Sequence, residues 1–268
     1  WEAVLENAYD IIVTGEINGE DTLSFKIPYR DSKRSYIDSE KKIQIVDDIY
    51  KVRTVTDTKD TEGNAITEVY AEAEFYDLTF SVRKEERSFE AETAEVPMTY
   101  ALAGTEWAVG TVNVRTKRTW TSSEKNALSI LRNVADLHGG DLVFDCANRL
   151  VHLLTVNGKD SGALFAYRKN MKSIQRVVDT RGLVTRLYAF GADGLTFADI
   201  NNGKPYVEDY TYTNEVRIST LDCSSFTNPY QMKEYAEMRL AQYAKPTISY
   251  VLNAMDLSVL TGYEHEAW

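Results

Sequence analysis

Apolar and polar residues alternate along much of the chain, and short turn sequences interrupt the alternation in a way that predicts antiparallel strand pairs. An Asn-Gly dipeptide supplies the two positive φ angles that a tight hairpin turn needs. Such dipeptides occur at Asn18-Gly19, Asn157-Gly158 and Asn202-Gly203. We expect the first to join Asp10–Ile17 to Thr22–Ile27, and the last to join Leu195–Ile200 to Pro205–Tyr212.

The same reasoning predicts a longer hairpin and a late strand. Ile49–Thr56 and Ala65–Val69 have the composition of strands, and the polar, glycine-containing stretch Asp60–Asn64 separates them. Near the end of the chain, Thr247–Leu252 again places apolar side chains at every second position. Both patterns add to the β content of the predicted fold.

Two segments combine helical spacing of apolar residues with clear end signals. Ser122–His138 is preceded by Thr121, which forms the pattern of a capping box with Glu124, and a glycine pair follows the segment. Asn228–Ala244 begins with a residue that caps helices well, and Pro246 forbids continuation. We therefore predict a helix at each segment.

Two further helices are predicted on weaker patterns. Tyr70–Val82 has apolar residues at helical spacing, and Pro97 suits the first turn of a short helix that stops at Gly104. Between them, Glu85–Glu95 is charged and lacks periodicity, which favours a linker. A second break is expected near Asp179–Gly182.

These elements predict an α+β fold in which strands dominate, built from small β-rich modules with one α/β insertion. The predicted modules are residues 1–92, 93–178 and 179–268. In the insertion, the helix Ser122–His138 is expected to pack on strands formed by Leu142–Phe144 and Leu150–Val156. Hairpin turns favour antiparallel neighbours throughout.

The charge of the chain disfavours one class of function, direct nucleic-acid binding. Among 268 residues the formal net charge is −11, and no cluster of Lys and Arg interrupts the acidic background. A protein that grips nucleic acid must neutralise phosphates, so direct DNA binding is not expected, whereas an acidic wall suits a conduit that DNA slides through. The 17 tyrosines favour strands and assembly interfaces. No apolar run has the length of a membrane helix, so no membrane insertion by this chain is expected.

Each of the three histidines has a structural interpretation. His138 closes a predicted helix, where a partly positive side chain complements exposed carbonyls. His152 lies within a strand-like run beside apolar residues. His265 stands between two glutamates, but adjacent residues on a strand point to opposite faces, which disfavours a metal site. No metal or cofactor is expected.

The cysteines and carboxylates also lack a catalytic pattern. Cys146 and Cys223 have no metal-ligand spacing, and a buried thiol is the favoured interpretation of each. Cys146 and His152 are six residues apart, too far for a hydrogen bond along one strand. Adjacent acidic pairs such as Glu85-Glu86 are expected on a solvated face. We therefore assign no catalytic, cofactor-binding or metal-binding residue.

Four blocks of sequence, in a fixed order from residue 17 to about residue 214, match one known family. One block reads Thr185-Arg186-Leu187-Tyr188, followed by Gly191 and Asp193-Gly194-Leu195. The others are Ile17–Phe25, Gly104–Trp107 with Gly110, and Phe165–Ile174. Together they resemble the siphophage tail-associated proteins called the prophage endopeptidase tail family.

The resemblance implies a fold similar to the baseplate hub proteins of contractile phages, with several small antiparallel β-barrel-like modules and an α/β insertion. Such hubs are homotrimers in which two barrel-like modules of each subunit build a pseudo-sixfold ring. The ring continues the tail tube at its distal end, closes it, and opens for genome ejection. The implied role is structural and not enzymatic.

The resemblance also implies partners and a location. Besides two further copies of itself, the chain would contact the distal tail protein, the tape-measure protein and a tail fibre or receptor-binding protein. DNA would pass through without specific binding. The protein would be made in the cytoplasm of the host bacterium and reside at the tail tip of the virion.

Two other functions remain open at this stage. The first is a tail-associated cell-wall peptidase or other peptidoglycan hydrolase, and the second is a host-receptor binding module. Family members often continue beyond a stretch like Leu257–Trp268 into more β structure, and sometimes into a fibre or a cell-wall hydrolase. The word "endopeptidase" fits such additions best, so no catalytic residue is carried over to this chain.

Overall fold

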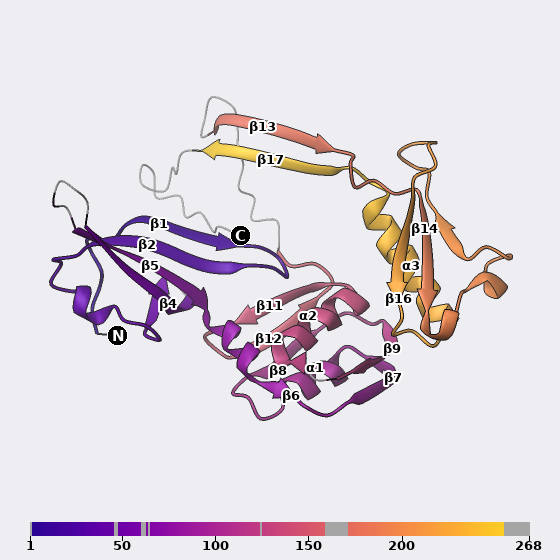
Figure 1. Cartoon of the computed structure of the whole chain (residues 1–268), viewed down its shortest axis with the longest axis horizontal. Helices are drawn as coiled ribbons and strands as arrows, with labels where there is room; N and C mark the ends of the chain where they lie inside the picture. Colours follow the sequence, from indigo (N-terminus) through magenta and orange to yellow (C-terminus); the bar gives the residue numbers. More distant parts are fainter. Residues whose placement is uncertain are drawn as a thin grey trace. The chain divides into compact units, whose positions relative to one another are not determined.

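The structure is a computed structural model that describes residues 2–45, 48–59, 63, 65–123, 125–158 and 171–254. Contacts between Cα atoms divide the chain into two units, Trp1–Val156 and Asn157–Trp268. Strands dominate both units, as Figure 1 shows, so the predicted α+β class with mostly β structure is confirmed. The predicted module boundaries at residues 92/93 and 178/179 stay predictions.

The first unit opens with a five-stranded antiparallel sheet in the order β1-β2-β5-β4-β3. Its strands are β1 (Tyr9–Gly15), β2 (Asp21–Pro28), β3 (Lys42–Ile45), β4 (Asp48–Lys59) and β5 (Ala65–Ala73). Leu23, Phe25 and Ile27 of β2 alternate with polar residues and are almost fully buried. The hairpins predicted around Asn18-Gly19 and Asp60–Asn64 are confirmed by the pairings β1–β2 and β4–β5.

The helix predicted at Tyr70–Val82 is wrong. Strand β5 extends to Ala73, a 3-10 helix occupies Glu74–Phe80, and the two-residue strand β6 (Val82–Arg83) follows. The buried residues of β5 recur at every second position, a period that overlaps with helical spacing in so short a run. The 3-10 helix is tied to β4 because the Asp77 carboxylate accepts hydrogen bonds from Lys51 Nζ at 3.0 Å and Arg53 Nη2 at 2.6 Å.

The rest of the first unit is an α/β structure. A three-stranded sheet, ordered β11-β12-β8, is in contact with two helices. These elements are β8 (Ala108–Val112), β11 (Asp141–Asp145), β12 (Leu150–Leu154), α1 (Glu95–Leu102) and α2 (Ala127–His138). The predicted packing of the long helix on β11, which pairs with β12, is confirmed, and α1 matches the short helix predicted near Pro97. Strand β12 pairs in parallel with β8, which the hairpin pattern did not predict.

Two predictions in this region are corrected. Helix α2 begins at Ala127, not Ser122, because the Asn126 side chain caps it by accepting a hydrogen bond from Ser129 N at 2.8 Å. Thr121 lies instead in β9 (Lys117–Ser122). The predicted linker Glu85–Glu95 contains β7 (Arg87–Thr93), which pairs with β9, and β10 (Lys125–Asn126) pairs with β6.

The lack of periodicity in β7 has a physical reason. Along most of β7 the side chains are exposed, and Phe89 is the one fully buried residue of the strand. The Phe89 ring packs on Trp120 of β9 with 4.9 Å between ring centroids. Phe89 thus gives a mostly exposed, charged strand its one fully buried aromatic contact, in addition to the pairing with β9.

The turn at Asn18 connects the first sheet to the α/β structure within this unit. Asn18 Oδ1 accepts a hydrogen bond from Leu142 N at 2.6 Å, and Asn18 Nδ2 donates to the Gly140 carbonyl at 3.0 Å. The side chain thereby satisfies two backbone groups beside β11. Its own backbone has a φ of 59°, which asparagine tolerates well.

We expect Asn18→Gly to lower the free energy of unfolding by about 1–2 kcal/mol, because glycine keeps the positive φ and removes both side-chain bonds. Urea unfolding followed by circular dichroism measures the change. Asn202→Gly is the matched control, because Asn202 also precedes a glycine and has a φ of 54°. Equal effects of the two substitutions would contradict the bridging role of Asn18.

The second unit contains a three-stranded sheet ordered β15-β14-β16, a helix and a separate two-stranded ribbon. The sheet and helix are β14 (Arg186–Gly191), β15 (Tyr206–Glu208), β16 (Ile218–Cys223) and α3 (Pro229–Tyr243). Strands β14 and β16 are parallel, and 3-10 turns occupy Ala192–Gly194 and Ala198–Ile200. The predicted helix is confirmed, with Asn228 Oδ1 accepting bonds from the amides of Tyr230 and Gln231.

The ribbon consists of β13 (Met171–Asp179) and β17 (Thr247–Ala254), so the late strand is confirmed. The hairpin predicted at Leu195–Ile200 is wrong, although Asn202 and Gly203 do have positive φ. Backbone groups of that segment bond locally in 3-10 turns around the fully buried Phe197, and β15 pairs with β14 instead. The second strand of the hairpin predicted at Asn157-Gly158 lies outside the described residues.

Candidate assembly site

Strand β1 is an edge strand that is exposed along its whole length. Among the described residues it pairs only with β2. Val13 lies opposite the fully buried Leu23 and so belongs to the core-facing side, yet it is 48% exposed. Ile12, opposite Ser24 on the other side, is 58% exposed. Both faces of the strand therefore present apolar side chains to solvent.

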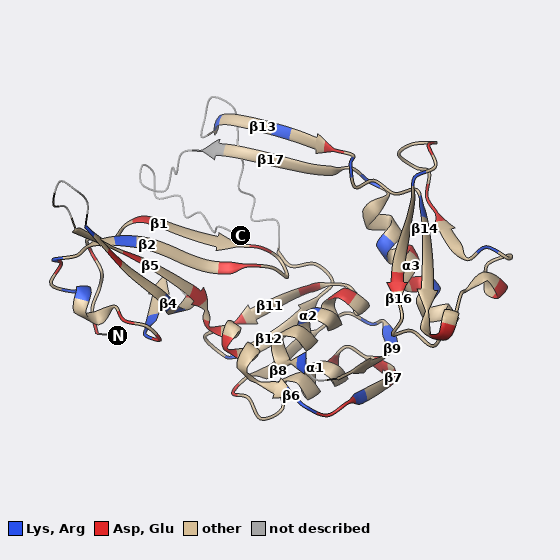
Figure 2. Ribbon diagram, viewed as in Figure 1, with Lys and Arg blue, Asp and Glu red and all other residues tan. Residues whose placement is uncertain are grey.

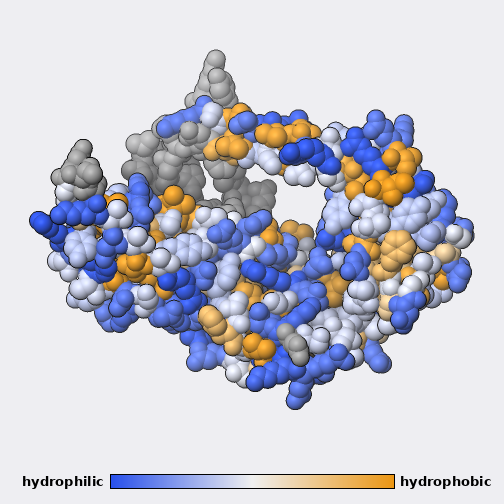
Figure 3. All heavy atoms as spheres, viewed as in Figure 1, coloured by the Kyte–Doolittle hydropathy of each residue, from blue (hydrophilic) through white to orange (hydrophobic). Residues whose placement is uncertain are grey.

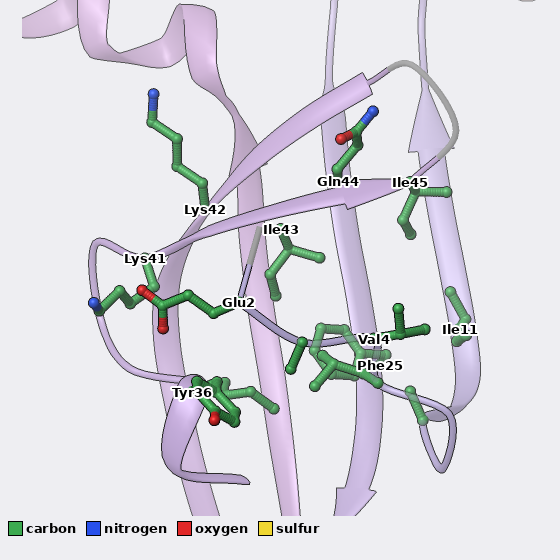
Figure 4. A pocket seen from close by; sticks show the side chains of 14 residues that line it. Glu2, Val4, Ile11, Phe25, Tyr36, Lys41, Lys42, Ile43, Gln44 and Ile45 are labelled. Carbon is green, nitrogen blue, oxygen red and sulfur yellow. The ribbon is translucent and has the colours of Figure 1, made fainter. Parts of the chain in front are cut away.

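A cavity of about 690 Å³ opens beside this strand (Figure 4). Ile11 of β1 and Ile43 and Ile45 of β3 line it from the two edges of the sheet, together with Phe25 and residues of the N-terminal segment such as Val4. The sheet thus curls so that its two edge strands border one apolar space without pairing with each other. This is a barrel-like arrangement with an open seam.

The ribbon of the second unit is amphipathic. Its register pairs Ile174 with Leu252, Arg176 with Tyr250 and Val178 with Ile248, and cross-strand partners share a face. The five apolar residues of this face are 41–56% exposed, and apolar side chains are visible along the ribbon in Figure 3. A two-stranded ribbon by itself is marginal in water, so this face is a candidate contact surface.

Charged residues are sparse on these strands. In β17 no described residue carries a charge, and β1 has only Asp10, which forms an ion pair with Lys26 at 3.2 Å (Figure 2). Natural sheets usually protect exposed edges with charges or prolines, because a bare edge pairs with other chains. Strand β17 lacks that protection, and β1 has it only at Asp10, near its start, so these two strands are the candidate assembly surfaces.

Residues of the block Thr185–Tyr188 make structural contacts within the second unit. The Thr185 hydroxyl is buried, donates to the Glu215 carbonyl at 2.8 Å and accepts from Arg217 N at 2.8 Å. Arg186 lies over the Tyr206 ring and bonds the Glu208 carboxylate at 2.6 Å. Hydrogen bonds from Tyr210 and Arg186 lower the pKa of Glu208 to about 2. These residues fasten β14 to its neighbours.

The histidines are engaged in structural bonds. His138 is buried at the end of α2, where its Nδ1 lies 3.2 Å from Thr116 Oγ1. His152 Nδ1 accepts a hydrogen bond from Thr111 N at 2.8 Å, and His265 lies outside the described residues. Within the described part of the chain, no three His, Cys, Asp or Glu side chains are grouped as metal ligands. No helix in that part is both long enough and apolar enough to cross a bilayer.

Both cysteines are buried free thiols, and burial raises the pKa of Cys146 and of Cys223 to about 12. Burial also raises the pKa of Tyr50 above its usual range, helped by the neighbouring Asp21. A thiol with so high a pKa carries almost no thiolate at neutral pH and is a poor nucleophile.

These shifts predict a loss of stability in alkali. Because the folded protein holds these protons more tightly than the unfolded chain, the unfolded state binds fewer protons above pH 9, and stability falls as the pH rises. We expect the urea midpoint to decline between pH 9 and pH 12, less steeply in a Cys146→Ala/Cys223→Ala variant.

A thiol reagent at pH 8 should label neither cysteine until urea is added. Rapid labelling of native protein would contradict the account.

Comparisons with known proteins agree with this architecture. Models described as prophage endopeptidase tail N-terminal domain, prophage endopeptidase tail domain and prophage endopeptidase tail match residues 1–73, 81–153 and 159–268. No curated protein matches the sequence.

Three solved structures share the fold. Prophage tail protein gp18 from Listeria monocytogenes EGD-e has a TM-score of 0.68 at 14% identity, over 92% of this chain and 76% of that one. The tail protein from Neisseria meningitidis MC58 has a TM-score of 0.62 at 14% identity, over 90% and 74%. The 43 kDa tail protein of prophage MuSo2 from Shewanella oneidensis has a TM-score of 0.61 at 12% identity, over 86% and 74%. With three family models covering nearly all of its length, this chain belongs to the prophage endopeptidase tail family, whose members are prophage tail proteins.

Proposed function

We propose that this tail protein is a structural hub at the distal end of the tail tube, where three copies form a ring that closes the tube and opens for genome ejection. The observation that carries the proposal is the pair of unprotected strand edges, β1 and β17, each with exposed apolar side chains. Unpaired strand edges and exposed apolar surfaces of this kind favour contact with another chain. A ring of subunits provides that cover.

The charge of the protein supports a role as a conduit. The net charge of −11 repels phosphates, so DNA would pass without being held. Basic residues in the described parts are dispersed along the elements in Figure 2. We propose the distal tail protein and the tape-measure protein as further partners, together with a tail fibre or receptor-binding protein.

We also propose that this chain does not catalyse a reaction. The family description contains the word endopeptidase, which keeps peptidoglycan hydrolysis as the alternative. A peptidase needs an activated nucleophile or a metal-bound water. Cys146 and Cys223 are protonated at neutral pH, and His138 and His152 are occupied by structural bonds. Incubation with purified peptidoglycan should release no new amino groups, and release that a single substitution abolishes would contradict this proposal.

The proposed location at the tail tip can be tested by immunoelectron microscopy of phage tails. Electron microscopy with gold-labelled antibody against this protein should place the label at the tail tip. Antibody against the major tube protein, which should decorate the shaft, is the control. Label along the shaft or on the capsid would overturn the hub.

A further inference from the structure

We propose that β17 of one copy pairs edge to edge with β1 of the next copy, so that the sheet of one subunit continues into the ribbon of its neighbour. The inference rests on the proposed ring and names the strands that would close it. It assigns β1 and β17 to opposite sides of one repeated interface.

The two edges are alike in chemistry, and each offers a stretch of backbone for pairing. Strand β1 has 7 residues and β17 has 8. Neither contains a proline, which would remove a backbone hydrogen-bond donor. A β-bulge between Tyr9 and Ile12 distorts the start of β1, so the regular edge available for pairing is Ile12–Gly15. That stretch carries no charge.

The faces of the two elements also match. If the sheet continues, the core-facing Ile11 and Val13 lie on the same side as the apolar ribbon face with Ile248, Tyr250 and Leu252. The ribbon would then cover the open seam of the cavity that Ile11 borders. On the opposite side, Ile12 would lie beside Val251, which is 60% exposed. Both faces of the joint would thus place apolar against apolar side chains.

A second copy of this chain is the occupant that these surfaces favour. Each chain carries one β1 and one β17, so the contact is heterologous, and a heterologous contact forms a ring when its rotation closes. Every copy would donate one edge and receive another, which leaves neither apolar strand exposed in the closed ring. A different partner protein would cover one edge and leave the other bare.

Disulfide trapping tests the pairing directly. In Ile12→Cys/Val251→Cys protein, mild oxidation at high protein concentration should give dimers and trimers on a non-reducing gel. The native cysteines are 8% and 1% exposed, so background from them should be small, and wild-type protein oxidised in parallel measures it. Either single-cysteine variant should give no ladder beyond that background. A disulfide formed only within one chain, or none at all, would overturn the proposal.

Introducing charges at the interface provides the second test. Ile12→Lys should weaken self-association, measured by analytical ultracentrifugation, by roughly tenfold or more, because an ammonium would be enclosed between apolar side chains. Adding Val251→Glu to the same chain should restore most of the affinity, since every interface then holds one charge of each sign. The matched control is Val216→Lys, which changes a valine of similar exposure (54%) outside the strands and should leave association unchanged.

The outcomes separate this inference from the proposed function. If wild-type protein forms trimers and Ile12→Lys leaves them intact without rescue by Val251→Glu, the hub stands and the strand assignment is wrong. If wild-type protein forms no trimers at high concentration or in tails, both the hub and the pairing are wrong. Circular dichroism checks that each variant folds, which we expect because the changed side chains are exposed in the single chain.

Discussion

Replacing Arg118 with methionine is expected to lower the free energy of unfolding by roughly 2–3 kcal/mol, although arginine is usually a surface residue. The Arg118 side chain is 1% exposed. Its Nε donates to the Leu137 carbonyl at 2.8 Å and its Nη1 to the Lys117 carbonyl at 3.1 Å. The carbonyls of the last helical turn lack partners within the helix, so Arg118 serves as a cap for α2. Methionine fills the space but cannot donate a hydrogen bond to either carbonyl.

Urea unfolding measures the effect, and two further variants sharpen it. Arg118→Lys keeps the charge but replaces the planar fork by a single ammonium, so it should also be less stable than wild type. Arg181→Met removes a side chain that is 91% exposed and should leave the unfolding midpoint unchanged. A methionine variant as stable as wild type would show that Arg118 does not cap α2.

Gly110→Ala is expected to destabilise the first unit by roughly 1–3 kcal/mol through overpacking. A Cβ atom at Gly110 would lie 2.5 Å from Cε1 and 2.6 Å from Nδ1 of His152. The ring cannot move away freely, because Nδ1 accepts the hydrogen bond from Thr111 N. Admitting the methyl group therefore costs either a clash or that bond.

A double variant separates the clash from other causes. His152→Ala alone should be mildly destabilising, because it loses the bond to Thr111. In the His152→Ala background, however, Gly110→Ala should be close to neutral, since the methyl group then meets empty space. Additive losses in the double variant would show that Gly110 is needed for a reason other than the His152 ring.

Local turn and capping chemistry predicted much of the fold. The hairpins at β1–β2 and β4–β5 follow from their turns, and α3 follows from Asn228 and Pro246. The errors arise where tertiary contacts decide. Around the buried Phe197 the chain forms 3-10 turns, although Asn202 and Gly203 have the backbone of the expected turn. In the charged strand β7, pairing with β9 and the packing of Phe89 on Trp120 decide the structure. The hydrophobic pattern of each strand does not indicate which distant strands will pair in parallel, as β8 does with β12 and β14 with β16.

The candidate assembly site could be predicted only in part. The strands were expected from alternation, but their exposure was not, because an apolar strand in a sequence is normally assigned to a core. Ile12 and Val251 have the same pattern in sequence as buried residues, and only the sheet order identifies β1 and β17 as edges. The close approach of the His152 ring to Gly110 could likewise not be predicted, because the two residues are 42 positions apart in the sequence.

The most direct test of the hub is the number of copies at the tail tip. An electron-microscopy reconstruction of the tip, with the symmetry determined from the particles, should contain three copies of this chain in one ring. In each copy two β modules should occupy alternating positions, so that three chains fill six roughly equivalent places around the channel. Six copies, one copy, or a density for this chain away from the ring would contradict the account.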